Sequence, residues 1–89
     1  MNAKSHLLLV NREARFLKTV SSSLLEAGYP VLTADSKSAA VDLLSASAIA
    51  LIICDSELSD CDGYDFLAYL KNNPASRHIP FIFLVSARF

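Results

Sequence analysis

The chain has 89 residues, of which 53% are hydrophobic and 19% charged, so it holds one domain at most and is too apolar to be disordered. Its formal net charge of −1 excludes binding to nucleic acid through bulk positive charge. The longest apolar run, Ala48–Cys54, is far shorter than the ~20 residues that a membrane span needs.

Short apolar runs alternate with segments of helical periodicity along the chain. The run Leu7–Val10 is typical of a strand buried on both faces of a parallel sheet. Asn11 can cap the helix that follows, and Gly28 stands where helices commonly end. The predicted elements are, in chain order, strand Leu7–Val10, helix Arg12–Ala27, strand Val31–Thr33, a helix capped by Ser36 with the buried stripe Ala39, Ala40, Leu43 and Leu44, strand Ala50–Cys54, helix Tyr64–Asn72 and strand Phe81–Val85.

The alternation of strands and helices predicts an α/β fold in which right-handed crossovers connect parallel strands. Binding and catalytic groups of such sheets lie at the C-terminal ends of the strands. The candidate site residues are therefore Asn11, Arg12 and Glu13 after the first strand, Asp55 after the third and Ser86 after the fourth.

Three motifs lie in register on this alternation. Asp55 directly follows the third strand, Asp62-Gly63 opens the helix that comes next, and Ser86-Ala87 follows the fourth strand. In this register they resemble the receiver domain of response regulators in two-component signalling, and the resemblance extends over the whole chain. It implies a flavodoxin-like sheet, with residues 1–89 forming one receiver domain that is incomplete at its C-terminus.

The resemblance implies a signalling module rather than an enzyme. Its chemistry would be the transfer of a phosphoryl group from the phosphohistidine of a histidine kinase to Asp55. Ser86 would supply the switch hydroxyl that hydrogen-bonds the phosphoryl group. A Mg²⁺ ion would be held by Asp55, by the backbone carbonyl of Glu57 and by Asn11.

The positions after the first strand depart from the family pattern, which has two acidic residues there. They read Asn11 and Arg12, so the charge of Arg12 cancels that of Asp55 where Mg²⁺ needs carboxylate ligands. We expect weak Mg²⁺ binding or none, and hypothesise that Arg12 takes the place of the metal and pairs with Asp55. Glu13 is interpreted as a residue of the first helical turn rather than a metal ligand.

The 89 residues also lack the fifth strand, with its lysine, and the last helices of a complete receiver domain. The fourth strand would then present an open apolar edge. We expect that the chain is a fragment of a longer protein or that it forms a homodimer by pairing through this edge.

Acidic residues gather in and after the loop that follows the third strand, a pattern that suits either a site or a solvated loop. Its position after a strand favours a site. The acids of this cluster are Asp55, Glu57, Asp60, Asp62 and Asp65.

Two other functions stay open. A phosphorylation-independent pseudo-receiver, acting as a protein-interaction module, is favoured by the loss of the acidic pair. A small flavodoxin-like ligand-binding protein is disfavoured, because no glycine-rich loop follows the first strand.

No helix-turn-helix pattern remains for direct nucleic-acid binding. The two cysteines, Cys54 and Cys61, are too few for a disulfide scaffold, which favours a reduced, cytoplasmic protein.

Overall fold

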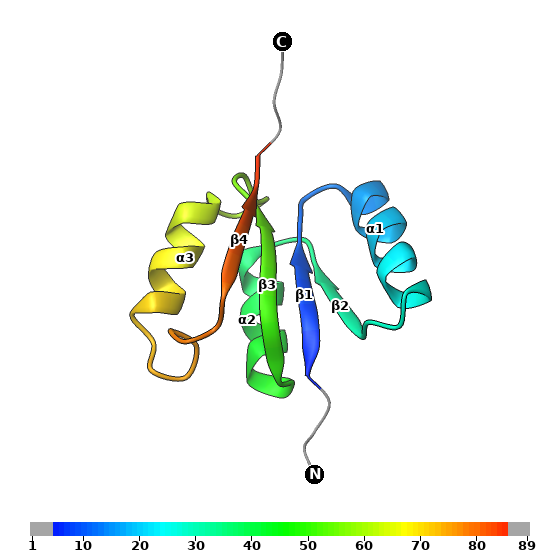
Figure 1. Ribbon diagram of the computed structural model, residues 1–89. Helices are drawn as coiled ribbons and strands as arrows, with labels where there is room; N and C mark the ends of the chain where they lie inside the picture. The colour runs from blue at the N-terminus through cyan, green and yellow to red at the C-terminus, as the bar shows by residue number, and fades with distance from the viewer. Residues whose placement is uncertain (1–4, 86–89) are drawn as a thin grey trace.

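The computed structural model of the protein describes residues 5–85, in which four parallel strands form one sheet (Figure 1). The strand order is β2-β1-β3-β4, so the two central strands are β1 and β3. Leu8 of β1 lies opposite Leu32 on one side and Ile52 on the other, and both pairings are parallel. The predicted parallel α/β sheet is confirmed. The strands are β1 (His6–Val10), β2 (Val31–Ala34), β3 (Ile49–Asp55) and β4 (Phe81–Leu84).

Three helices connect the strands and cover the sheet. The connection from β1 to β2 runs toward the β2 edge of the sheet. The connections from β2 to β3 and from β3 to β4 run in the opposite direction, toward the β4 edge. Because crossovers between parallel strands are right-handed, α1 lies on one face and α2 and α3 lie on the other. The helices are α1 (Ala14–Glu26), α2 (Lys37–Ala46) and α3 (Gly63–Lys71), and none of these is long and apolar enough to cross a membrane.

The main hydrophobic core lies between the sheet and the pair α2 and α3. Leu8 and Ile52 of the central strands are fully buried there with Ala40 of α2 and Phe66 of α3. Leu9 is also buried, and because side chains alternate along a strand it faces the side covered by α1. Burial on both faces explains why the central strands are continuous apolar runs.

The first helix begins two residues later than the sequence predicts. Asn11 does not cap the helix itself; its Oδ1 accepts a hydrogen bond of 2.9 Å from the N–H of Glu13. This turn delays the helix, which begins at Ala14 with Glu13 as its N-cap residue. Gly28 ends α1 as predicted, with a φ of +95° that favours glycine.

Strand β4 lies at one edge of the sheet, and no further strand within residues 5–85 pairs with it. It ends at Leu84, one residue before the predicted end. Ile82 and Val85 are 47% and 68% exposed, so apolar side chains reach the surface along this edge. Within residues 5–85, β4 therefore presents the apolar edge expected from the sequence.

Candidate functional site

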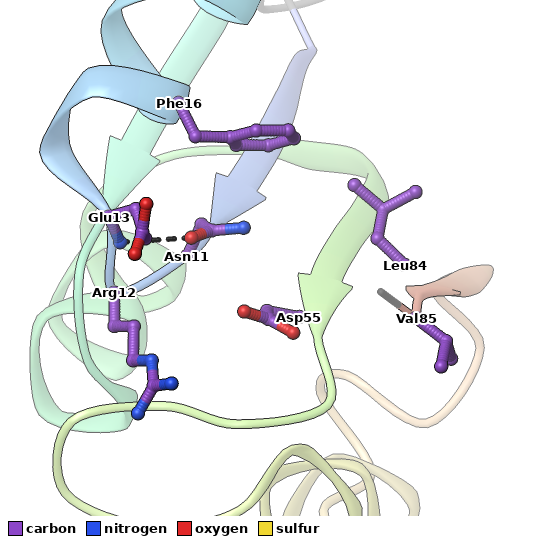
Figure 2. A pocket seen from close by; sticks show the side chains of 7 residues that line it. All are labelled: Asn11, Arg12, Glu13, Phe16, Asp55, Leu84 and Val85. Carbon is purple, nitrogen blue, oxygen red and sulfur yellow. Dashed lines mark hydrogen bonds between the residues drawn. The ribbon is translucent and has the colours of Figure 1, made fainter. Parts of the chain in front are cut away.

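A cavity of about 360 Å³ lies at the C-terminal ends of β1, β3 and β4 (Figure 2). The parallel strands bring together here residues that are more than 40 positions apart in the sequence. The cavity therefore lies where the sequence placed the site. Its lining residues are Asn11, Arg12 and Glu13 after β1, Phe16 of α1, Asp55 of β3, Leu84 of β4 and Val85. Phe16, Leu84 and Val85 were not predicted, since an apolar side chain near a strand end carries no chemical signal in the sequence.

Asp55 is the last residue of β3, and its carboxylate faces the cavity (Figure 2). The pairing of β3 with both β1 and β4 fixes its backbone. Its Oδ1 accepts one hydrogen bond, at 3.4 Å, from the N–H of Glu57. At that length the bond is weak, so the carboxylate oxygens remain free to act as acceptors or as nucleophiles.

The expected pair between Arg12 and Asp55 is not formed. Nη2 of Arg12 lies 3.2 Å from Oε1 of Glu57, and this is the one ion pair found in the described part of the chain. Figure 2 shows the guanidinium extending past Asp55 toward the loop that follows β3. The two side chains are 49% and 67% exposed, so the pair is a surface salt bridge. Arg12 therefore lines the cavity as expected, but its ion-pair partner is Glu57 rather than Asp55.

The residues present do not fit a Mg²⁺ site in this arrangement. Asn11 is buried, and its Oδ1 is already engaged by the N–H of Glu13. Glu13 is exposed at the start of α1, as interpreted from the sequence. Among residues 5–85, no group of three His, Cys, Asp or Glu side chains could hold a metal ion. Asp55 thus offers the cavity one carboxylate with the guanidinium of Arg12 near it, whereas Mg²⁺ prefers several oxygen ligands.

The loop after β3 is fastened to the start of α2. The carboxylate of Asp60 accepts hydrogen bonds from the N–H groups of Lys37 (2.8 Å) and Ser38 (3.1 Å). Ser59 Oγ donates to the carbonyl of Asp35 at 2.9 Å. These contacts cap α2 from a distant segment and hold the backbone next to Glu57. No sequence pattern indicates these hydrogen bonds, because the partners are more than 20 residues apart.

The acidic cluster therefore divides by role. Asp60 caps α2, and Asp62 caps α3 by accepting a 2.8 Å hydrogen bond from the N–H of Asp65. Asp55 lines the cavity, and Glu57 pairs with the Arg12 that lines it. The cluster is neither one metal site nor a merely solvated loop.

Replacement of Asp60 by Asn is expected to destabilise the protein at neutral pH and much less at low pH. The backbone hydrogen bonds from Lys37 and Ser38 lower the pKa of Asp60 below its ordinary value of 3.8. A lowered folded-state pKa contributes stability above pH ~4, which is lost as the pH falls through the folded pKa. Urea unfolding at pH 7 and at pH 3 measures the difference. An Asp42→Asn variant, with the same charge change at an exposed position of α2, is the matched control, and at pH 7 it should lose less stability than the Asp60 variant.

The two thiols beside the site are not reactive groups. Burial raises the pKa of Cys54 to about 12, and its Sγ donates to the carbonyl of Asp55 at 3.1 Å. Burial also raises the pKa of Cys61. Both therefore remain protonated and unreactive near neutral pH. The predicted switch hydroxyl, Ser86, lies outside the described residues.

The profile of one protein family, the response regulator receiver domain, matches residues 7–88. A probable transcriptional regulator, ycf29 of Pyropia yezoensis, is 34% identical to this chain over 80 residues. The aligned residues make up 90% of this chain but only 36% of the length of that relative. The N-terminal domain of a response regulator receiver protein from Methanoculleus marisnigri JR1 has a TM-score of 0.88 at 25% identity, over 98% of this chain and 71% of that one. The signal receiver domain of a histidine kinase from Syntrophus aciditrophicus has a TM-score of 0.85 at 29% identity, over 97% and 65%. With the sheet order and the aspartate at the end of β3, these matches establish that the chain belongs to the response regulator receiver domain family.

Proposed function

We propose that this receiver module accepts a phosphoryl group on Asp55 from the phosphohistidine of a histidine kinase. The observation that carries the proposal is the free carboxylate of Asp55 at the edge of the cavity, with a single long hydrogen bond. A carboxylate paired with a guanidinium would be a poorer nucleophile, but Arg12 pairs with Glu57 instead. The cavity of about 360 Å³ leaves room for a phosphoryl group beside Asp55.

The proposed step is a direct displacement at phosphorus. A carboxylate oxygen of Asp55 forms the new O–P bond while the N–P bond of the phosphohistidine breaks. The electron pair of that bond returns to the imidazole, which takes up a proton from water. The transferring group carries charge on its three equatorial oxygens, so a nearby cation assists the step.

Intact mass spectrometry after incubation with acetyl phosphate tests this proposal. We expect a gain of one phosphoryl group by the protein and none by an Asp55→Asn variant. Asp42→Asn serves as the matched control, since it makes the same chemical change on α2 and should leave the gain intact. Loss of the modification in neutral hydroxylamine would identify it as an acyl phosphate. A gain that persists in Asp55→Asn would contradict the assignment of Asp55.

A second candidate function is that of a pseudo-receiver that binds partner proteins without being phosphorylated. The observation that favours it is the presence of Asn11 and Arg12 where the family pattern has acidic residues. The same mass experiment separates the two functions. If no phosphoryl group is gained with or without Mg²⁺, the pseudo-receiver is the better description.

We also propose that a second copy of the chain covers the apolar edge at β4. Exposed apolar side chains on an unpaired edge strand favour pairing with another strand, and a lysine there prevents it. Sedimentation velocity at micromolar concentration should detect a dimer that an Ile82→Lys variant does not form. Leu25→Lys, at an exposed apolar position on α1 (55% exposed, against 47% for Ile82), is the control. A compact monomer in the unsubstituted protein would refute the pairing.

A further inference from the structure

Of the described residues that line the cavity, Arg12 alone carries a positive charge. Asp55 and Glu13 carry negative charges there, and a phosphorylated Asp55 would carry close to two negative charges in place of one. The two positions directly after β1 hold Asn11 and Arg12 rather than acids that could bind a metal ion. Any oxyanion bound in this cavity therefore has the Arg12 guanidinium as its nearest available counter-charge.

The contact that holds Arg12 away from Asp55 is a weak one. It joins a single guanidinium nitrogen to a single carboxylate oxygen at 3.2 Å, and both side chains are about half exposed or more. Ion pairs of this kind contribute little to stability, because water screens them and two long side chains lose freedom. A guanidinium has five N–H donors, so several stay available to bind a phosphate through two parallel hydrogen bonds.

The backbone around Glu57 is held by contacts to other segments, whereas the Arg12 side chain is 49% exposed and has one ion pair. The backbones of Glu57 and Asp62 form an isolated antiparallel β-bridge. The loop between them is hydrogen-bonded to the start of α2 through the carboxylate of Asp60. Arg12 follows β1 directly and lines the same cavity as Asp55. A rotation of the Arg12 side chain, without movement of the loop, would take the guanidinium from Glu57 toward Asp55.

We propose that Arg12 and Glu57 form a latch over a metal-independent oxyanion site, in which Glu57 competes with a phosphate group at Asp55 for the Arg12 guanidinium. The role in phosphorylation rests on the proposed function, while anion binding by the cavity does not. In the unmodified protein the Arg12 guanidinium forms its ion pair with the carboxylate of Glu57. When a phosphoryl group or a phosphate ion is present, Arg12 exchanges partners and Glu57 is left facing solvent.

Titration with inorganic phosphate in the presence of EDTA, followed by the backbone amide NMR signals of positions 12 and 55, tests the latch. An Asp55→Asn background removes the repelling charge and makes the test independent of phosphorylation. In this background Arg12→Gln should abolish saturable binding. Glu57→Gln should tighten binding up to about fivefold, which corresponds to the loss of one competing surface pair.

Glu13→Gln is the matched control, because it removes the same charge from a residue that lines the cavity and has no ion pair with Arg12. The latch predicts a larger gain for Glu57→Gln than for Glu13→Gln. That difference should vanish when Arg12 is also replaced by Gln. Equal gains for the two variants, binding that survives Arg12→Gln, or no saturable binding in any variant would each overturn the proposal.

The outcomes also separate this proposal from the proposed function. If Asp55 gains a phosphoryl group but Glu13→Gln and Glu57→Gln change the phosphate affinity equally, the latch proposal is refuted and the acceptor role of Asp55 stands. Phosphate binding that depends on Arg12, without any phosphoryl gain, supports the oxyanion site and removes the acceptor role.

Discussion

Replacement of Gly63 by Ala is expected to lower the free energy of unfolding by about 3 kcal/mol or more. A Cβ atom at Gly63 would lie 2.5 Å from the backbone oxygen of Asp55 and 2.8 Å from Cε1 of Phe83. The oxygen belongs to the last residue of β3 and cannot move without disturbing the sheet. The Gly63 N–H also donates to the carbonyl of Ser56 at 2.8 Å, which fixes the close approach. Urea unfolding measures the loss, which is large against the 5–15 kcal/mol typical of small proteins.

Gly28→Ala is the matched control for this effect. No atom lies within 4 Å of a Cβ built at Gly28, so only the positive φ of +95° opposes the substitution. The expected loss is about 1 kcal/mol. If both variants lost the same stability, the close approach at Gly63 would not be the cause. The Gly63 variant should also be phosphorylated more slowly than the Gly28 variant, because relief of the contact displaces Asp55.

The fold could be predicted from the sequence because the information that specifies it is local. Apolar runs such as Leu7–Val10 and the cap at Ser36 act within a few residues, and the structure confirms both. The start of α1 was predicted less well. Asn11 can cap a helix or close a turn, and its hydrogen bond to the Glu13 N–H decides between them. The Asp62-Gly63 motif was recognised from its resemblance to a family, and only the structure explains why glycine is needed there.

The cavity contains Asn11, Arg12, Glu13 and Asp55 as expected from the sequence, but the contacts of Arg12 differ from the expected ones. Asp55 and Arg12 were expected together because both follow strands of one parallel sheet, and the cavity brings them together. The partner of Arg12 was wrong, because a long side chain can reach several acids and the sequence does not rank them. The anchoring of Asp60 to α2 joins segments more than 20 residues apart, and no spacing rule points to it.

Replacement of Arg12 by Asp is expected to create Mg²⁺ binding at the cavity, with an affinity at least about 100-fold above that of the unsubstituted protein. The change removes one positive charge and adds one negative charge beside Asp55, and it also frees the carboxylate of Glu57. Even in water, with a dielectric constant of ~80 and a separation of about 6 Å, two unit charges acting on a divalent ion contribute about 2.8 kcal/mol. Isothermal titration calorimetry with MgCl₂ measures the gain.

The control for this prediction is Arg15→Asp, which makes the same charge change on an exposed residue of α1 that does not line the cavity. It should alter Mg²⁺ affinity only slightly, because solvent and salt screen charges at that position. Equal affinities of the two variants would mean that Arg12 is not what opposes the metal. If Mg²⁺ binds only to the Arg12 variant, the same substitution should remove phosphate binding in EDTA, because the guanidinium is then no longer available to the anion. One residue would thus determine whether this receiver holds a phosphoryl group with a metal ion or with an arginine.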